Sequence, residues 1–181
     1  MLKKLINKYR STTDLNRFLI IGGSLFLLWR VFRKWMILEG QYMEFTNTWA
    51  SAYLIIANFV LSILGYDTSV DPSMNKLWLT GASQSIEVVY DCMGINLFFI
   101  FMIFIMAYPG RLRTKLWFIP TGIGLIFLLN SLRMAALAVI AANKYHLLDL
   151  YHHFIFQGVI YLIIFVLWWW FSSINKEALN P

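Results

Sequence analysis

The sequence predicts an all-α integral membrane protein with about four transmembrane helices, one interfacial amphipathic helix and a small extracytoplasmic β-hairpin. Of its 181 residues, 60% are hydrophobic and only 13% are charged, and the mean hydropathy is +0.65, which is unlike a soluble globular domain. The basic residues behind the net charge of +6 stand beside apolar runs. They form no aromatic-interleaved patch, so membrane topology explains the charge and no nucleic acid is expected as a partner.

The amino terminus is a basic segment followed by an apolar run. Four basic residues in residues 1–16 alternate with leucine and isoleucine, a pattern typical of a short amphipathic helix on an anionic membrane surface. We therefore expect residues 1–16 to form a cytoplasmic segment and residues 17–181 to form a single multipass membrane domain. Phe18–Phe32 is interpreted as a retained first span, because no small-residue cleavage site follows it.

The run Thr46–Gly65 has two interpretations. It is long enough to cross a membrane, but polar side chains recur along one helical face, which suits a helix in the outer interface or one packed against other spans. These side chains are Thr48, Ser51, Asn58 and Ser62. We favour the interfacial position for the topological reason given below, and the spanning alternative stays open.

The sizeable polar segment Tyr66–Asp91 is expected to contain the β-hairpin. Its turn signals are Asp71-Pro72-Ser73 and Gly81-Ala82-Ser83. They bound strand candidates at Lys76–Thr80 and Ser85–Tyr90. The hairpin would deliver the chain to Cys92, the only cysteine of the protein.

Three further apolar runs follow, and a basic cluster between the first two sets the topology. The runs are Leu97–Tyr108, Leu116–Ala142 and His152–Phe171, and the cluster is Arg111, Arg113 and Lys115. With four spans, an interfacial Thr46–Gly65 and a cytoplasmic amino terminus, nine of the fifteen Lys and Arg residues lie in the cytoplasm. A spanning Thr46–Gly65 would move one of the two large basic clusters outside, against the positive-inside rule.

This topology brings Cys92, Arg133 and the pair His152-His153 to the outer leaflet. Cys92 and the histidines stand at the outer ends of their spans, and Arg133 lies roughly 6 Å beyond the middle of its span on the same side. Asn130 shares the helical face of Arg133. An arginine inside a membrane is costly and is expected to be functional or paired. The alternatives to a functional site are that the Cys92 thiol is inert and that the histidines are anchors at the membrane interface.

The set has a chemical logic as a cysteine active site. Imidazole can take the thiol proton and later act as general acid, while a guanidinium favours the thiolate and can hold a developing oxyanion. Adjacent helical residues point about 100° apart, so we expect one of His152 and His153 to be essential, with a slight preference for His152. One cysteine allows no internal disulfide and no multi-thiolate zinc site, and neither a metal nor a cofactor is expected.

Three short motifs resemble those of the exosortase/archaeosortase family of multipass membrane transpeptidases. They are Cys92-Met93-Gly94 at the head of one span, Asn130-Ser131-Leu132-Arg133 within the next, and histidine at the head of the last. The compact form resembles the short exosortases of Bacteroidetes-like bacteria. The resemblance implies that Cys92 is the nucleophile, Arg133 its electrostatic partner and a histidine of the 152–153 pair the acid/base, with Asn130 and Gly94 in support.

The expected function is therefore a membrane-embedded cysteine protease and transpeptidase of the bacterial inner membrane, with its active site on the extracytoplasmic side. It would cleave the sorting signal of exported proteins that end in a motif, an apolar helix and a basic tail, and would transfer them through a thioester to a lipid or polysaccharide acceptor. Two alternatives stay open: a non-catalytic membrane scaffold or assembly factor, and a thiol-dependent lipid acyltransferase.

Overall fold

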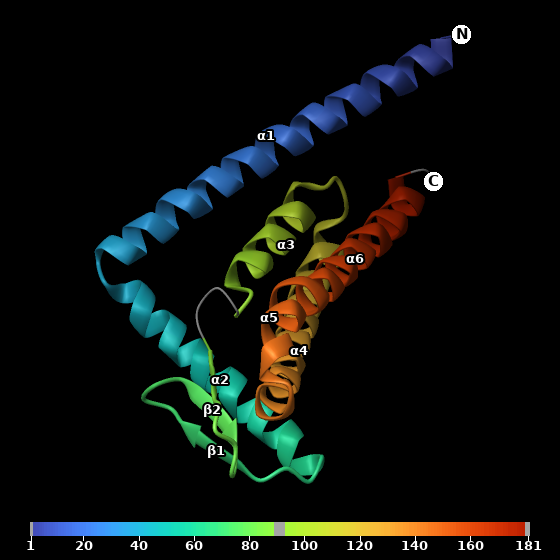
Figure 1. The fold of residues 1–181 in the computed structure, drawn as a ribbon. Coiled ribbons are helices and arrows are strands. Elements are labelled where there is room, and N and C mark those ends of the chain that lie inside the picture. The colour runs from blue at the N-terminus through green and yellow to red at the C-terminus, as the bar shows by residue number, and fades with distance from the viewer. Residues whose placement is uncertain (1, 89–92, 180–181) are drawn as a thin grey trace.

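The computed structural model describes residues 2–88 and 93–179, with side chains described for residues 15–42, 44–88 and 93–175. It is mostly helical, with one small sheet at the end of the molecule opposite the chain termini (Figure 1). The long helices are α1 (Leu2–Leu38), α2 (Gln41–Ile63), α4 (Leu112–Asn143) and α6 (Phe156–Leu179). The short elements are β1 (Thr68–Asp71), β2 (Lys76–Leu79), β3 (Ile86–Glu87), α3 (Ile95–Ala107), the 3₁₀ turn η1 (Tyr145–Leu147), α5 (Leu148–Leu150) and the π-helical turn η2 (Tyr151–Ile155).

Three helical segments of the described chain are long and apolar enough to cross a membrane. They are Leu15–Leu38, Leu112–Asn143 and Tyr145–Asn175. Large apolar side chains on α1 and α6 face outward, among them Leu27, Phe165 and Trp169, as is expected of helices that contact lipid. The protein is therefore a membrane protein.

α3 is shorter than the predicted span that it represents. Its 13 residues cover about 20 Å at 1.5 Å per residue, while a bilayer core is about 30 Å thick. Its first turn lies against the middle of α4, because the backbone of Gly94 touches the side chain of Asn130. The residues before α3 are thus set against the interior of the helix bundle.

α1 contains two segments that the sequence predicts separately. Residues 2–16 and the run Phe18–Phe32 are parts of one uninterrupted helix that ends at Leu38. The residues near position 16 contain neither proline nor glycine to end a helix.

α2 lies beside the sheet, and its polar side chains bond there or to its own backbone. Asn75 Nδ2 donates to Asn47 Oδ1 at 3.0 Å, and the hydroxyl of Thr68 donates to Asn58 Oδ1. Ser51 and Ser62 bond to carbonyls of the preceding helical turn. The polar stripe predicted for Thr46–Gly65 is therefore partly a sheet-packing surface. α2 is not among the three helices long and apolar enough to cross a membrane that the described residues contain.

The sheet has three antiparallel strands in the order β1-β2-β3. The predicted hairpin corresponds to β2 and β3, and β1 is an additional strand that the sequence pattern did not predict. The turn between β1 and β2 is held by Asp71, whose Oδ1 accepts bonds from the main-chain N–H and the hydroxyl of Ser73, at 3.0 and 2.6 Å. The hydroxyl bond keeps the pKa of Asp71 below its ordinary value.

Two close packings fix α3 and α6 against α4. The ring of Phe101 lies on Gly122, where any Cβ would clash with it. The second packing involves α6, whose buried Asn175 side chain lies on Gly110 in the turn between α3 and α4. Phe171 then fills the space between Phe118 and Tyr108, with ring centroids 4.9 and 5.9 Å away.

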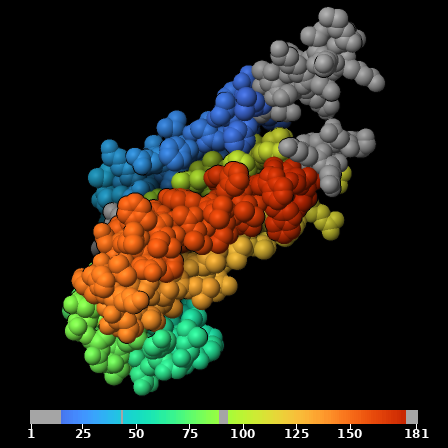
Figure 2. Space-filling model, turned by 45° about the vertical axis from the view of Figure 1, so that its right-hand side comes forward, coloured from blue at the N-terminus to red at the C-terminus, as the bar shows by residue number. Residues whose placement is uncertain are grey.

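One end of the molecule carries the sheet, and the opposite end carries a group of basic residues. Figure 2 shows the turn after α2 and the sheet at one end, with α1 and α6 running toward the other. The aromatic contact of Phe18 with Phe104, at 5.4 Å, places the start of the α1 span beside the end of α3. The basic cluster Arg111–Lys115 follows α3 directly. Arg17 and this cluster therefore share one end, opposite the sheet.

Candidate active site

The turn before α3 and the middle of α4 are in direct contact. Gly94 caps α3 with a backbone φ of +70°, a conformation that favours glycine. A Cβ at this position would also overlap the amide nitrogen of Asn130. The contact brings Gly94 next to the motif that begins at Asn130.

Asn130 is fully buried, and the hydrogen-bonding groups of its side-chain amide are unsatisfied among the described residues. Neither Oδ1 nor Nδ2 has a hydrogen-bond partner among the described residues. An unsatisfied buried polar group costs about 1–3 kcal/mol, so such a side chain calls for an explanation other than packing. Because it touches Gly94, the amide lies beside the residue that caps the start of α3.

Arg133 lies on α4 one helical turn beyond Asn130. Its side chain is buried, with 8% of the residue exposed. Nη2 donates to the main-chain oxygen of His152 at 3.2 Å. The bond ties the middle of α4 to the segment that begins the last helix, and it brings the two predicted groups together.

The two histidines occupy different environments in the π-helical turn η2. Turns of this kind are frequent at functional sites. His152 lines a cavity, whereas 57% of the side chain of His153 is exposed and its Nε2 lies 3.4 Å from Asp149 Oδ1. The imidazole rings are perpendicular, with centroids 4.5 Å apart. Of the pair, His152 alone has access to the cavity.

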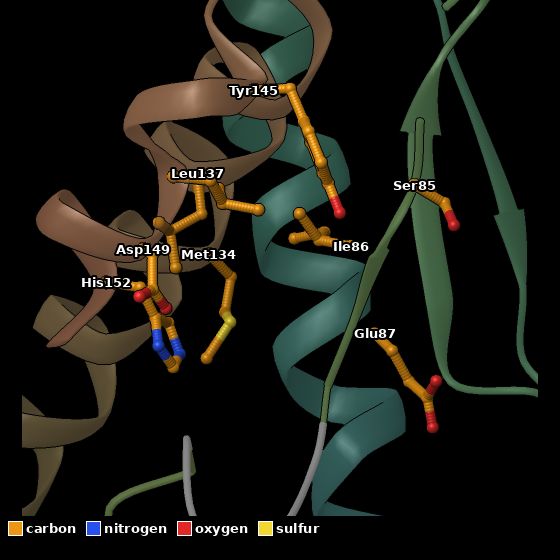
Figure 3. A pocket seen from close by; sticks show the side chains of 9 residues that line it. Ser85, Ile86, Glu87, Met134, Leu137, Tyr145, Asp149 and His152 are labelled. Carbon is orange, nitrogen blue, oxygen red and sulfur yellow. The ribbon is translucent and has the colours of Figure 1, made fainter. Parts of the chain in front are cut away.

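The cavity has a volume of about 440 Å³, within the range of about 300–1,000 Å³ typical of ligand sites. Figure 3 shows β3 on one side and the segment carrying Asp149 and His152 on the other. Met134 and Leu137 of α4 lie between them. The site thus has one wall of extended chain, one wall that carries an imidazole, and an apolar floor.

Tyr53 is a supporting residue that sequence reasoning missed. It is fully buried in α2 and its hydroxyl donates to the main-chain oxygen of Met93 at 2.5 Å. Its ring lies 4.5 Å from that of Phe127 in α4. Tyr53 therefore holds the residue that follows Cys92. The sequence pattern that could have indicated Tyr53 is its position on an otherwise small and apolar face of α2, between Ala50 and Ala57 at helical spacing.

Cys92 itself lies outside the described residues. Its chain neighbour Met93 is buried. Tyr53 bonds the main-chain oxygen of Met93, and Asn130 packs against Gly94. The described residues contain no cluster of three or more His, Cys, Asp or Glu side chains that could hold a metal ion.

Comparison with known proteins identifies a family. The family model described as Transmembrane exosortase matches residues 36–170, about three quarters of the chain. No curated protein and no solved structure matches. The matched range includes α2, the sheet, and every residue described above for the candidate site. The chain is a member of the transmembrane exosortase family.

Proposed function

We propose that the protein is a cysteine transpeptidase that cleaves exported proteins near a carboxy-terminal apolar helix and transfers them to an acceptor. Family membership supports a membrane transpeptidase, and the Gly94–Asn130 contact carries the residue-level proposal. In this contact Gly94, two residues after Cys92 in the sequence, lies beside Asn130, and Arg133 bonds the backbone of His152.

The chemistry assigns one role to each group. His152 takes the proton of the Cys92 thiol, and the thiolate attacks the carbonyl carbon of the scissile peptide bond. Arg133 donates to the oxygen on which negative charge develops. As the C–N bond breaks, the imidazolium returns its proton to the leaving amine, and the acyl group stays on Cys92 as a thioester.

The second half reaction releases the product. A nucleophile from a membrane lipid or polysaccharide attacks the thioester carbonyl and gives its proton to His152. The C–S bond then breaks, and Cys92 leaves the acyl group as a thiolate that recovers its proton from the imidazolium. The substrate class is exported proteins with a carboxy-terminal motif, an apolar helix and a basic tail. On this proposal the active site faces the extracytoplasmic side of the bacterial inner membrane, and Asn130 and Gly94 position the nucleophile.

The test is the fate of exported proteins in cells that carry Cys92→Ala. Exported proteins that keep their carboxy-terminal helix should accumulate in the membrane, while the variant itself stays at the wild-type level. The matched control is His153→Ala, which alters an exposed group beside the site. Normal processing with Cys92→Ala would overturn the proposal and favour a scaffold role. Loss of acylated lipid without loss of protein processing would favour an acyltransferase.

A further inference from the structure

Arg17 and Lys115 form a pair of cations where the start of the α1 span lies beside the end of α3. The Lys115 ammonium donates to the main-chain oxygen of Met106 at 2.8 Å, and Arg17 lies near enough for its positive charge to act on that ammonium. No carboxylate among the described side chains forms an ion pair with either group. Because an ammonium has three N–H donors, two remain on Lys115 that can bind an anion.

An apolar groove between α1, α3 and α6 begins beside this cation pair. It has a volume of about 300 Å³, and apolar and aromatic side chains and two glycines line it. Phe18, next to Arg17 in the sequence, and Ala107, next to Met106, are among the lining residues. They mark the end of the groove at which the cations lie. Figure 1 shows α3 between α1 and α6, and α3 contacts both helices.

The two glycines of α1 shape the groove. Gly22 allows α1 to lie close to α3, since a Cβ there would be 3.6 Å from the Cβ of Ala107. A Cβ on Gly23 would meet no atom within 4 Å, although Gly23 is one of the residues that line the groove. The lack of a side chain at Gly23 therefore leaves this space open.

We propose that the groove and the cation pair bind one anionic membrane lipid, with an acyl chain in the groove and the headgroup phosphate between Arg17 and Lys115. Basic pockets between transmembrane helices bind such headgroups. The charges favour a lipid over a protein helix, because the basic tail of the proposed substrate and the same cations of a second parallel copy would both be repelled here. The lipid would join α1 to α3. This site goes beyond the proposed function, and neither proposal depends on the other.

The first experiment identifies the lipids bound to the full-length protein by native mass spectrometry. The probe is an equimolar mixture of phosphatidylglycerol and phosphatidylcholine with identical acyl chains. The wild-type protein should retain one phosphatidylglycerol in preference to phosphatidylcholine. In Lys115→Gln and in Arg17→Gln this preference should fall about fivefold, which is the contribution of one basic residue near an anionic lipid. Arg113→Gln removes the same charge from the same basic cluster and should keep the preference. Equal preferences in Lys115→Gln and Arg113→Gln would overturn the inference.

The second experiment tests the groove with Gly23→Leu and the matched control Gly124→Leu. Both leucines enter open space on a helix, but only Gly23 lines the groove. Gly23→Leu should lower the retention of phosphatidylglycerol severalfold, and Gly124→Leu should leave it unchanged. Circular dichroism checks the fold of each variant, and Lys115→Arg, which keeps the charge, should bind as the wild type does. Equal retention in the two leucine variants would overturn the inference. So would a spectrum in which Gly23→Leu removes a dimer or a bound peptide instead of a lipid.

Discussion

Arg133 Nη2 donates to the main-chain oxygen of His152 at 3.2 Å, which joins the middle of α4 to the π-helical turn before α6. The residue is 8% exposed within a helix long and apolar enough to cross a membrane. A buried cation costs free energy, and a planar guanidinium can hold a main-chain oxygen and a developing oxyanion together. Arg133 therefore links α4 to the start of the last helix, and in the proposed mechanism it would also hold the oxyanion.

The first prediction concerns Arg133→Lys. Lysine keeps the charge but lacks the planar fork, so processing should fall at least about tenfold, since a hydrogen bond from a charged group contributes about 1.5–3 kcal/mol. The measurement is the rate of substrate cleavage normalised to membrane level. Arg113→Lys, an exposed residue in the basic cluster after α3, is the matched control and should be silent. Equal rates for both variants would remove Arg133 from the site.

The second prediction separates the histidines. His152→Ala removes the imidazole that lines the cavity and should slow processing about 10²-fold or more, the usual contribution of a general base. His153→Ala removes an exposed ring that lies beside the His152 ring and an exposed carboxylate but does not line the cavity, and it should change the rate less than about twofold. The check is a pulse-chase assay of substrate processing. The opposite order would assign the base to His153.

A third prediction uses the Gly94–Asn130 contact as a suppressor test. Gly94→Ala adds a methyl group against the Asn130 amide at a backbone φ of +70°, and should destabilise the protein by about 1–3 kcal/mol. Removing the amide in Gly94→Ala/Asn130→Ala should restore part of the membrane level but not the processing rate. The readouts are thermal unfolding in detergent and processing. If the double variant is no more stable than Gly94→Ala, a clash with the Asn130 amide does not cause the loss of stability in Gly94→Ala.

The fourth prediction concerns Tyr53. Tyr53→Phe deletes the hydroxyl that holds Met93 and should lower processing about two- to tenfold, the equivalent of one hydrogen bond. Cleavage kinetics give the measurement. Tyr66→Phe, at an exposed site beyond the end of α2, should have no effect. An unchanged rate in Tyr53→Phe would show that the turn before α3 is held by other contacts.

The fifth prediction is topological and uses the single cysteine. Cys92→Ala gives a cysteine-free protein in which Ser73→Cys, in the turn between β1 and β2, and Arg113→Cys, at the opposite end, can each be introduced. In spheroplasts a membrane-impermeant maleimide should label Ser73→Cys and not Arg113→Cys, because Arg17 and the cluster Arg111–Lys115 lie at the end away from the sheet. Labelling of Arg113→Cys alone would invert the topology and move the site to the cytoplasmic side.

The sequence was sufficient to select most of the polar residues discussed here, because polar groups stand out in apolar helices. Asn130 and Arg133 are one helical turn apart, and helical geometry alone puts them on one face. The difference between His152 and His153 needed the π-helical turn η2 and the cavity beside it, since spacing shows only that the rings diverge.

Other features depend on contacts between distant segments and could not be read from local pattern. The Gly94–Asn130 contact requires the packing of α3 against α4. The partner of Tyr53 is a main-chain oxygen 40 residues away. β1 forms because Thr68–Asp71 finds β2, although its own alternation is weak. The continuity of α1 from Leu2 to Leu38 is likewise a property of the whole segment, since charge and hydropathy divide it into a basic and an apolar part.

The central claim is that Cys92 carries the substrate as a thioester, and the most direct measurement is the mass of the protein itself. Full-length protein should be isolated from cells starved of acceptor, and the peptide containing Cys92 should be analysed with and without neutral hydroxylamine. The account predicts an acyl adduct on Cys92 that hydroxylamine removes and that is absent from Cys92→Ala and reduced in His152→Ala. Active processing with no adduct at Cys92, or with an adduct that survives hydroxylamine, would contradict it.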